Sequence, residues 1–174
     1  MPFDIITIEP TVSDGAHADG DVMFNLTSFT LPARACKLVK CFMQVAAGGG
    51  EDSTKIGVLF FKKNTQPTLG TLNATADISA SDFVSNEFIG STSLTLTDRG
   101  LLDRDLIDNV AIYYGGHNMT NELATTNFSF QTDPMILKSD KADYTMFVGA
   151  VFHAANSTDF DGTSNVKLFL HVEY

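Results

Sequence analysis

The sequence predicts an all-β fold: a β-sandwich of the jelly-roll type with one short connector helix, formed by a single domain spanning residues 1–174. Short apolar runs recur at intervals of roughly 10 to 20 residues, separated by loops rich in Gly, Ser, Thr, Asn and Asp. The connections between these runs are longer than simple hairpins, which is typical of a jelly roll. The chain has no Trp, so it lacks the buried Trp beside paired cysteines that marks an immunoglobulin-type sandwich.

The first half of the chain contains four expected strands, which are residues 3–9, 22–30, 36–47 and 55–63. Residues 36–47 alternate, with Val39 and Cys41 on one face and Lys40 on the other, as in a sheet with one solvent-exposed side. Residues 55–63 are apolar on both faces and charged at both ends, which predicts a buried central strand.

The second half contains six more expected strands, which are residues 83–89, 91–97, 109–114, 127–137, 144–152 and 165–174. The connector helix is expected at residues 98–108, where Asp98 would cap the first turn and Leu102 and Leu106 share one face. Residues 165–174 carry the clearest alternation of apolar and polar side chains in the chain, which predicts a half-buried strand.

Three apolar side chains in the last two expected strands are candidates for an interface. Phe147 and Val151 lie on the second face of residues 144–152, and Phe169 interrupts the polar face of residues 165–174. A two-sheet sandwich buries one face of each strand, so these side chains are in excess of its core. They are expected to be buried either under the loops or against another subunit.

The two cysteines, Cys36 and Cys41, are expected to be buried thiols. An odd separation of five places them on opposite faces of a regular strand, roughly 16 Å apart at about 3.3 Å per residue. A disulfide needs Cα atoms within about 7 Å. No third ligand lies near them in the sequence, so a zinc site is not expected either.

No catalytic, cofactor-binding or metal site is predicted. The sequence has no pair of His residues separated by one residue and followed by Glu, as in a cupin, and no Gly-x-Ser-x-Gly elbow. The nearest metal candidates are Asp159, Asp161 and Asn165, which flank Gly162 as in part of a calcium loop. Leu168 stands where that loop needs a bidentate Glu, so a turn is the preferred interpretation.

The charge of the chain argues against nucleic acid as a partner. The sequence has 21 acidic and 11 basic residues, a net charge of −10, and it lacks the clusters of Lys and Arg that a phosphate-binding surface needs.

No apolar run approaches the ~20 residues that span a bilayer, so a membrane is not expected as a partner. Residues 1–4 lack the features of a secretory signal, so we expect the protein to stay in a cytoplasm or to leave it inside a larger assembly.

The acidic β-rich composition, the Thr/Ser/Asn-rich loops, the free thiols and the strand at residues 166–174 together resemble a family, the structural proteins of tailed-phage virions. Capsid decoration (cement) proteins with jelly-roll-like domains are the nearest type. The resemblance implies a non-enzymatic homo-oligomer, with a trimer favoured, that binds the major capsid protein on the outer surface of a virion assembled in the host cytoplasm. It carries over no individual site residue.

A carbohydrate- or receptor-binding module is the alternative function. Such a module would need a platform of exposed aromatic side chains. Tyr113, Tyr114 and Phe160 are the candidates for this platform, although the lack of Trp disfavours it.

Overall fold

Nine antiparallel strands and one short helix make up the described part of the computed structural model, which covers residues 1–13, 15, 17–46, 55–96, 110–115, 135–153 and 166–174. The elements are β1 (Phe3–Ile8), β2 (Val22–Thr30), β3 (Ala35–Ala46), β4 (Lys55–Phe61), α1 (Ala80–Ser85), β5 (Phe88–Leu96), β6 (Val110–Gly115), β7 (Ile136–Lys138), β8 (Thr145–Phe152) and β9 (Val166–Glu173). No helix among these residues is long and apolar enough to span a membrane.

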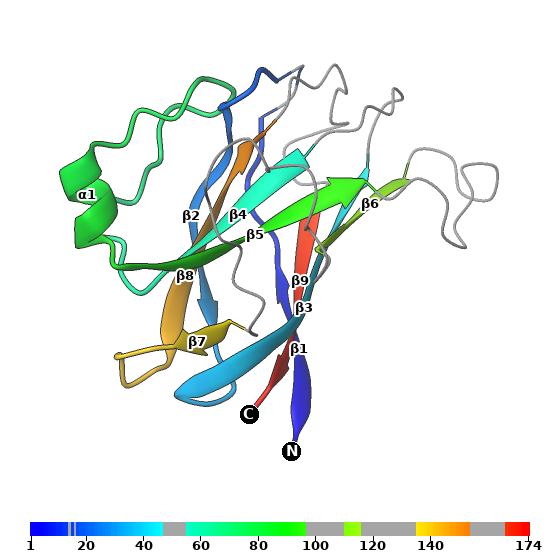
Figure 1. Cartoon of the computed structure of the whole chain (residues 1–174), viewed down its shortest axis with the longest axis vertical. Coiled ribbons are helices and arrows are strands. Elements are labelled where there is room, and N and C mark those ends of the chain that lie inside the picture. Colours follow the sequence, from blue (N-terminus) through cyan, green and yellow to red (C-terminus); the bar gives the residue numbers. More distant parts are fainter. Residues whose placement is uncertain (14, 16, 47–54, 97–109, 116–134, 154–165) are drawn as a thin grey trace, which may run out of the picture.

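Eight of the strands follow one hydrogen-bonded path in the order β1-β9-β3-β6-β5-β4-β8-β2, and β7 pairs with β3 beside it. The link between β5 and β6 is only three residue pairs long, from Leu94↔Gly115 to Leu96↔Tyr113. The path therefore folds into two four-stranded sheets, β1-β9-β3-β6 and β5-β4-β8-β2, which pack face to face (Figure 1). Successive strands cross repeatedly between the sheets, which is the jelly-roll arrangement, so the predicted β-sandwich is confirmed.

The core lies between the two sheets and is built from the alternating apolar side chains of their strands. In β9, the side chains of Val166, Leu168, Leu170 and Val172 are fully buried while those between them are more exposed. This pattern confirms the alternation that the sequence predicts. The largest fully buried side chains of this core are Phe24, Phe60, Phe152, Met23, Met43, Met146, Leu31, Ile56, Leu94 and Leu137.

A β-bulge in β3 changes which side chains face the core. The pairing with β9 shifts register between Leu38 and Lys40, so Val39 is an extra residue and is 36% exposed. The prediction that Val39 shares the buried face of Cys41 is therefore wrong. The bulge also reverses the phase of the strand, because one inserted residue moves all later side chains to the other face. Cys36 and Cys41 consequently both face the core as free, buried thiols.

The described residues contain one helix, α1, at a place where the sequence predicts none. The helix expected at residues 98–108 lies outside the described residues and stays a prediction. The last three residues of α1 overlap the expected strand 83–89, so the strand prediction is wrong for residues 83–85. Ser79 caps α1 by accepting a hydrogen bond from the backbone N–H of Asp82 at 3.1 Å. The strand resumes as β5, which runs through Gly90 without the expected break. Of the expected strand 127–137, only its end coincides with β7, and residues 127–134 are not described.

Candidate partner-binding surface

The outer face of the β5-β4-β8-β2 sheet is covered by the chain itself. Residues 62–87, which connect β4 to β5 and include α1, lie along this face (Figure 1). A second hydrophobic cluster forms between the connection and the sheet, where Leu69 of the connection is buried with Val22, Phe61 and Phe147 of the strands. The rings of Phe61 and Phe83 meet edge to face with their centroids 5.2 Å apart, which joins α1 to the sheet.

Two of the three interface candidates belong to this covered face. Phe147 is only 5% exposed, and the ammonium group of Lys141 lies 4.5 Å from the centre of its ring. Val151 is partly buried in the same cluster. Of the two alternatives for the excess apolar side chains, burial under a loop therefore accounts for both. A partner would have to displace residues 62–87 to reach Phe147.

Two asparagine side chains fasten this connection to the sheet and to itself. The Asn25 side chain on β2 accepts a hydrogen bond from the backbone N–H of Leu69 at 2.6 Å and donates one to the carbonyl of Gly70 at 3.0 Å. The fully buried Asn86 accepts from the N–H of Gln66 at 2.9 Å and donates to the carbonyl of the same residue at 2.7 Å. Each amide thus satisfies backbone groups that have no strand neighbour.

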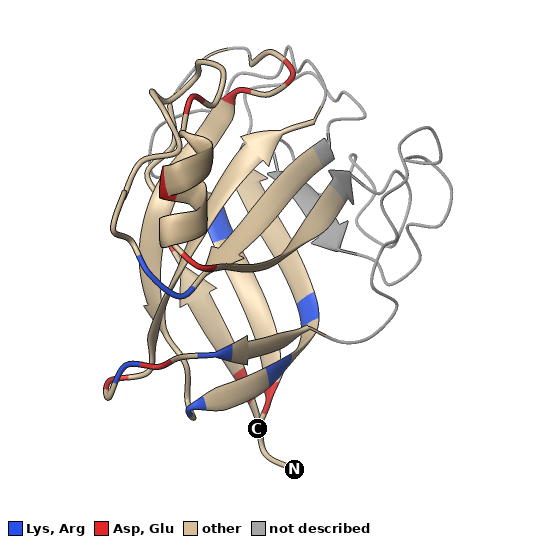
Figure 2. Cartoon of the chain, turned by 60° about the vertical axis from the view of Figure 1, so that its left-hand side comes forward, with Lys and Arg blue, Asp and Glu red and all other residues tan. Residues whose placement is uncertain are grey.

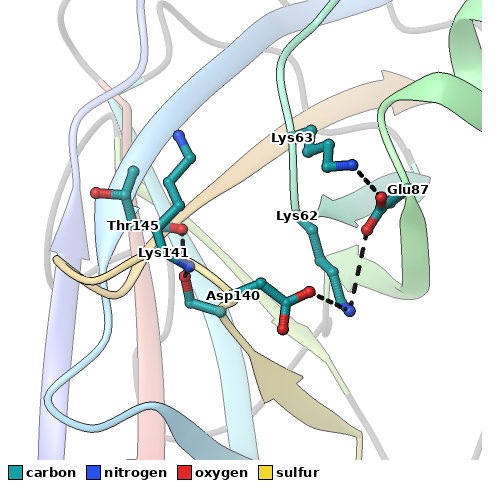
Figure 3. Close-up of polar contacts among 7 residues, drawn as sticks. Lys62, Lys63, Glu87, Asp140, Lys141 and Thr145 are labelled. Carbon is teal, nitrogen blue, oxygen red and sulfur yellow. Dashed lines mark hydrogen bonds and ion pairs between the residues drawn. The ribbon is translucent and has the colours of Figure 1, made fainter.

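Ion pairs join the first residues of the connection, Lys62 and Lys63, to its last residue, Glu87 (Figure 3). The ammonium group of Lys62 lies 2.9 Å from a carboxylate oxygen of Asp140 and 4.0 Å from one of Glu87, and Lys63 also pairs with Glu87. The hydrogen bond from Lys62 lowers the pKa of the Asp140 carboxyl. These groups are largely solvent-exposed, so they orient the connection more than they stabilise it.

The outer face of the β1-β9-β3 strands presents large apolar side chains to solvent. Thr7, Phe169 and Phe42 stand side by side in the register of these three strands. The rings of Phe42 and Phe169 stack with centroids 4.7 Å apart at 10°, and His171 meets Phe42 edge on at 5.4 Å. Both phenylalanines are half-buried. Phe169, the third interface candidate, therefore lies on a surface that a partner could reach.

Two residues of β1 extend this surface to the edge of the sheet. Phe3 is 68% exposed and Ile5 is 55% exposed, and both side chains lie on the same face as Phe169. We call the set Phe3, Ile5, Phe42, Phe169 and His171 the β1-β9-β3 face. An apolar centre with a polar rim is the usual composition of a protein interface.

Charged side chains border this face. Lys167 and Glu9 are 2.8 Å apart, and Lys37 and Glu173 are 3.3 Å apart. Figure 2 shows both basic and acidic residues near the end of the molecule that holds both termini.

A shallow pocket of about 340 Å³ lies on the connection, between Gln66, Thr68, Gly70, Asp77, Ser79 and Asp82. Its lining is mostly polar.

Among the described residues no group of three His, Cys, Asp or Glu side chains could hold a metal ion. The metal candidates Asp159, Asp161 and Asn165 fall outside the described residues, as do Phe160 and the side chains of Tyr113 and Tyr114. These remain predictions.

Sequence reasoning selected Phe169 but missed Phe3 and Ile5. The available signal was the alternation of Phe3, Ile5 and Thr7 against Ile6 and Ile8, which assigns two large apolar side chains to an outward face. Neither a protein-family model nor a curated protein matches the sequence.

Proposed function

We propose that this chain is a non-enzymatic structural protein of a virus particle, a capsid decoration (cement) protein. It binds the major capsid protein on the outer surface of the shell and stabilises the shell through protein–protein contacts. The observation that carries the proposal is the contrast between the two sheets. One outer face is covered by residues 62–87, while the β1-β9-β3 face presents Phe3 and Ile5 at 68% and 55% exposure.

The energetics of the β1-β9-β3 face support a binding role. Fully burying a Phe or Ile side chain stabilises a complex by about 1.5 to 3 kcal/mol before the entropy lost on association is counted. The stacked rings of Phe42 and Phe169 are already held in one geometry, so less side-chain entropy is lost when a partner covers them. Aromatic anchors of this kind commonly supply most of the affinity of an interface.

The net charge of −10 suits the outer surface of the shell. Packaged DNA repels an acidic protein from the interior, and the outer surface lies farther from that charge. The proposed location is therefore the outside of the virion, reached by assembly in the host cytoplasm. The resemblance to decoration proteins adds that the bound form is a homo-oligomer, with three copies favoured.

The proposal is tested by co-sedimentation of the purified protein with preformed capsids of the virus that encodes it. The unmodified protein is expected to bind, and Phe169→Ala and Ile5→Ser are each expected to weaken binding about tenfold. Val84→Ser is the matched control, because Val84 is 73% exposed on α1, over the covered sheet. Circular dichroism verifies that each variant is folded. Failure of the unmodified protein to bind, or unchanged binding by both face variants, would refute the proposal.

A carbohydrate- or receptor-binding role is the second candidate. It is favoured by the stacked Phe42 and Phe169 rings with the polar side chains of His171 and Lys40 beside them. A glycan array separates the two functions. Binding to a glycan that is lost in Phe169→Ala, together with no binding to capsids, would select this candidate instead.

A further inference from the structure

The two strands that end the hydrogen-bonded path, β1 and β2, have different outer edges. The outer edge of β2 is occupied by the connection between β4 and β5. The N–H of Val22 donates to Ala74 at 2.9 Å, the carbonyl of Val22 accepts from Asn73 at 3.0 Å, and Leu26 donates to Pro67 at 3.2 Å. This edge therefore cannot accept another strand without losing these bonds.

Among the described residues, no other strand or loop forms backbone hydrogen bonds with the outer edge of β1. Tyr174 donates to the carbonyl of Pro2 at 3.2 Å, and the antiparallel register with β9 then directs the N–H and C=O groups of Asp4, Ile6 and Ile8 toward β9. Those of Phe3, Ile5 and Thr7 point away from the sheet. The N–H of Ile5 donates to the adjacent Asp4 carboxylate at 2.8 Å, an exposed bond that confirms this direction.

We infer that β1 pairs with β1 of a second copy of this chain, antiparallel, about a two-fold axis at Ile5. This register places Ile5 opposite Ile5 of the second copy, and Phe3 opposite its Thr7. All three outward-facing residues of each strand then exchange backbone hydrogen bonds with the other copy, about six bonds in total. Registers centred on Phe3 or Thr7 leave part of this short strand unpaired.

The side chains of β1 fit a second copy of itself. Phe3, Ile5 and Thr7 are exposed and share one face, so the two-fold axis brings both sets together on one surface. Asp4 faces Ile6 of the second copy, so no like charges stand directly opposite one another. The two β1-β9-β3 faces become one continuous surface across six strands. The pairing is independent of the proposed capsid partner, since it requires only this chain.

The pairing also determines the size of the assembly. Within the described part of the chain, β1 is the path end whose outer edge carries no backbone partner, and self-pairing about a two-fold axis uses that edge in both copies. The assembly therefore closes at two copies and does not continue as a filament. On this point the edge geometry favours a dimer, whereas the resemblance to decoration proteins favours a trimer.

The first test is the mass of the full chain in solution by sedimentation equilibrium. A dimer is expected, and Ile5→Lys should weaken it about tenfold or more, because two like charges then stand opposite each other and two apolar side chains are lost. The matched control Val84→Lys should leave the dimer unchanged. A monomer at the highest soluble concentration would overturn the inference, as would a dimer or trimer unaffected by Ile5→Lys.

The second test reports the register. In an Ile5→Cys variant the two new thiols belong to a directly opposed pair with Cα atoms about 5.5 Å apart, within the range of a disulfide. Mild oxidation should therefore give a covalent dimer in Ile5→Cys and not in Val84→Cys. Cys36 and Cys41 are buried and do not compete. A folded Ile5→Cys protein that does not cross-link more than Val84→Cys would rule out the two-fold axis at Ile5.

Discussion

Replacing Asn25 by Ala is expected to loosen the connection, residues 62–87, from the outer face of the β5-β4-β8-β2 sheet. The amide of Asn25 accepts from the N–H of Leu69 at 2.6 Å and donates to the carbonyl of Gly70 at 3.0 Å. Leu69 is 1% exposed and Gly70 is also buried, so neither backbone group gains a water molecule easily when the amide is removed. The substitution therefore leaves the Leu69 N–H without an acceptor in the interior and removes one of the two hydrogen bonds to the Gly70 carbonyl, which still accepts from the Thr68 hydroxyl at 2.8 Å.

The magnitude follows from these two hydrogen bonds. Each contributes about 0.5 to 1.5 kcal/mol net, and a buried group left without a partner costs about 1 to 3 kcal/mol. We expect Asn25→Ala to lower the free energy of unfolding by about 2 to 4 kcal/mol. For a chain of 174 residues this corresponds to a fall in melting temperature of about 4 to 16 °C.

Urea denaturation and hydrogen exchange measure this effect separately for the whole fold and for the connection. Exchange should rise first in residues 64–78, because the amide bonds of Asn25 hold this segment. Asn64→Ala is the control, since Asn64 is exposed in the same connection. If Asn25→Ala shifted the urea midpoint no more than Asn64→Ala and left exchange unchanged, Asn25 would not be what fastens residues 62–87 to the sheet.

Three further predictions concern packing and titration. Phe147→Ala should lower the free energy of unfolding by about 3 to 5 kcal/mol in urea denaturation, because Phe147 is a buried core residue. A change below about 1 kcal/mol would show that Phe147 is not buried beneath residues 62–87. Burial raises the pKa of the Cys41 thiol, so its contribution to stability should be complete below the unfolded thiol pKa of about 8.5 and fall as the pH rises above it. Urea denaturation against pH should show this slope, Cys41→Ala should flatten it, and a thiol reagent should modify Cys36 and Cys41 only after unfolding. Lys62 lowers the pKa of Asp140, so their contact should be present above the unfolded carboxyl pKa of about 3.9 and be lost as the pH falls through the lower folded value. In an NMR titration Lys62→Met should raise the pKa of Asp140, and an unchanged value would show that the contact does not persist in solution.

Sequence periodicity alone was sufficient to predict the fold class and its clearest strands. The alternation of residues 165–174 appears in β9 as buried side chains at every second position, because a pleated strand between core and solvent imposes a period of two. The doubly apolar run at residues 55–63 became β4, which lies between β5 and β8 and whose outer face is covered. Local pattern carries this information because each strand has the same two environments along its whole length.

Only the tertiary structure separated Phe147 from Phe169. In the sequence both are aromatic residues on the second face of a strand, and both are interface candidates although Phe169 stands among polar neighbours and Phe147 beside Val151. The structure buries Phe147 because a connection that is polar in composition folds back over one sheet, and Asn25, distant in sequence, fastens it there. Phe169 remains half-buried on the other sheet. The position of a long connection depends on contacts distant in sequence, which periodicity does not record.

The bulge at Val39 was likewise decided by tertiary pairing. The sequence places Cys36 and Cys41 on opposite faces of a regular strand, yet both are buried because one extra residue in β3 lets the strand keep its register with β9 on either side. The open edge of β1 also follows from strand order, which no single strand encodes. The sequence therefore determined that this protein is a β-sandwich with more apolar side chains than its core needs, and the tertiary structure decided which of them a partner can reach.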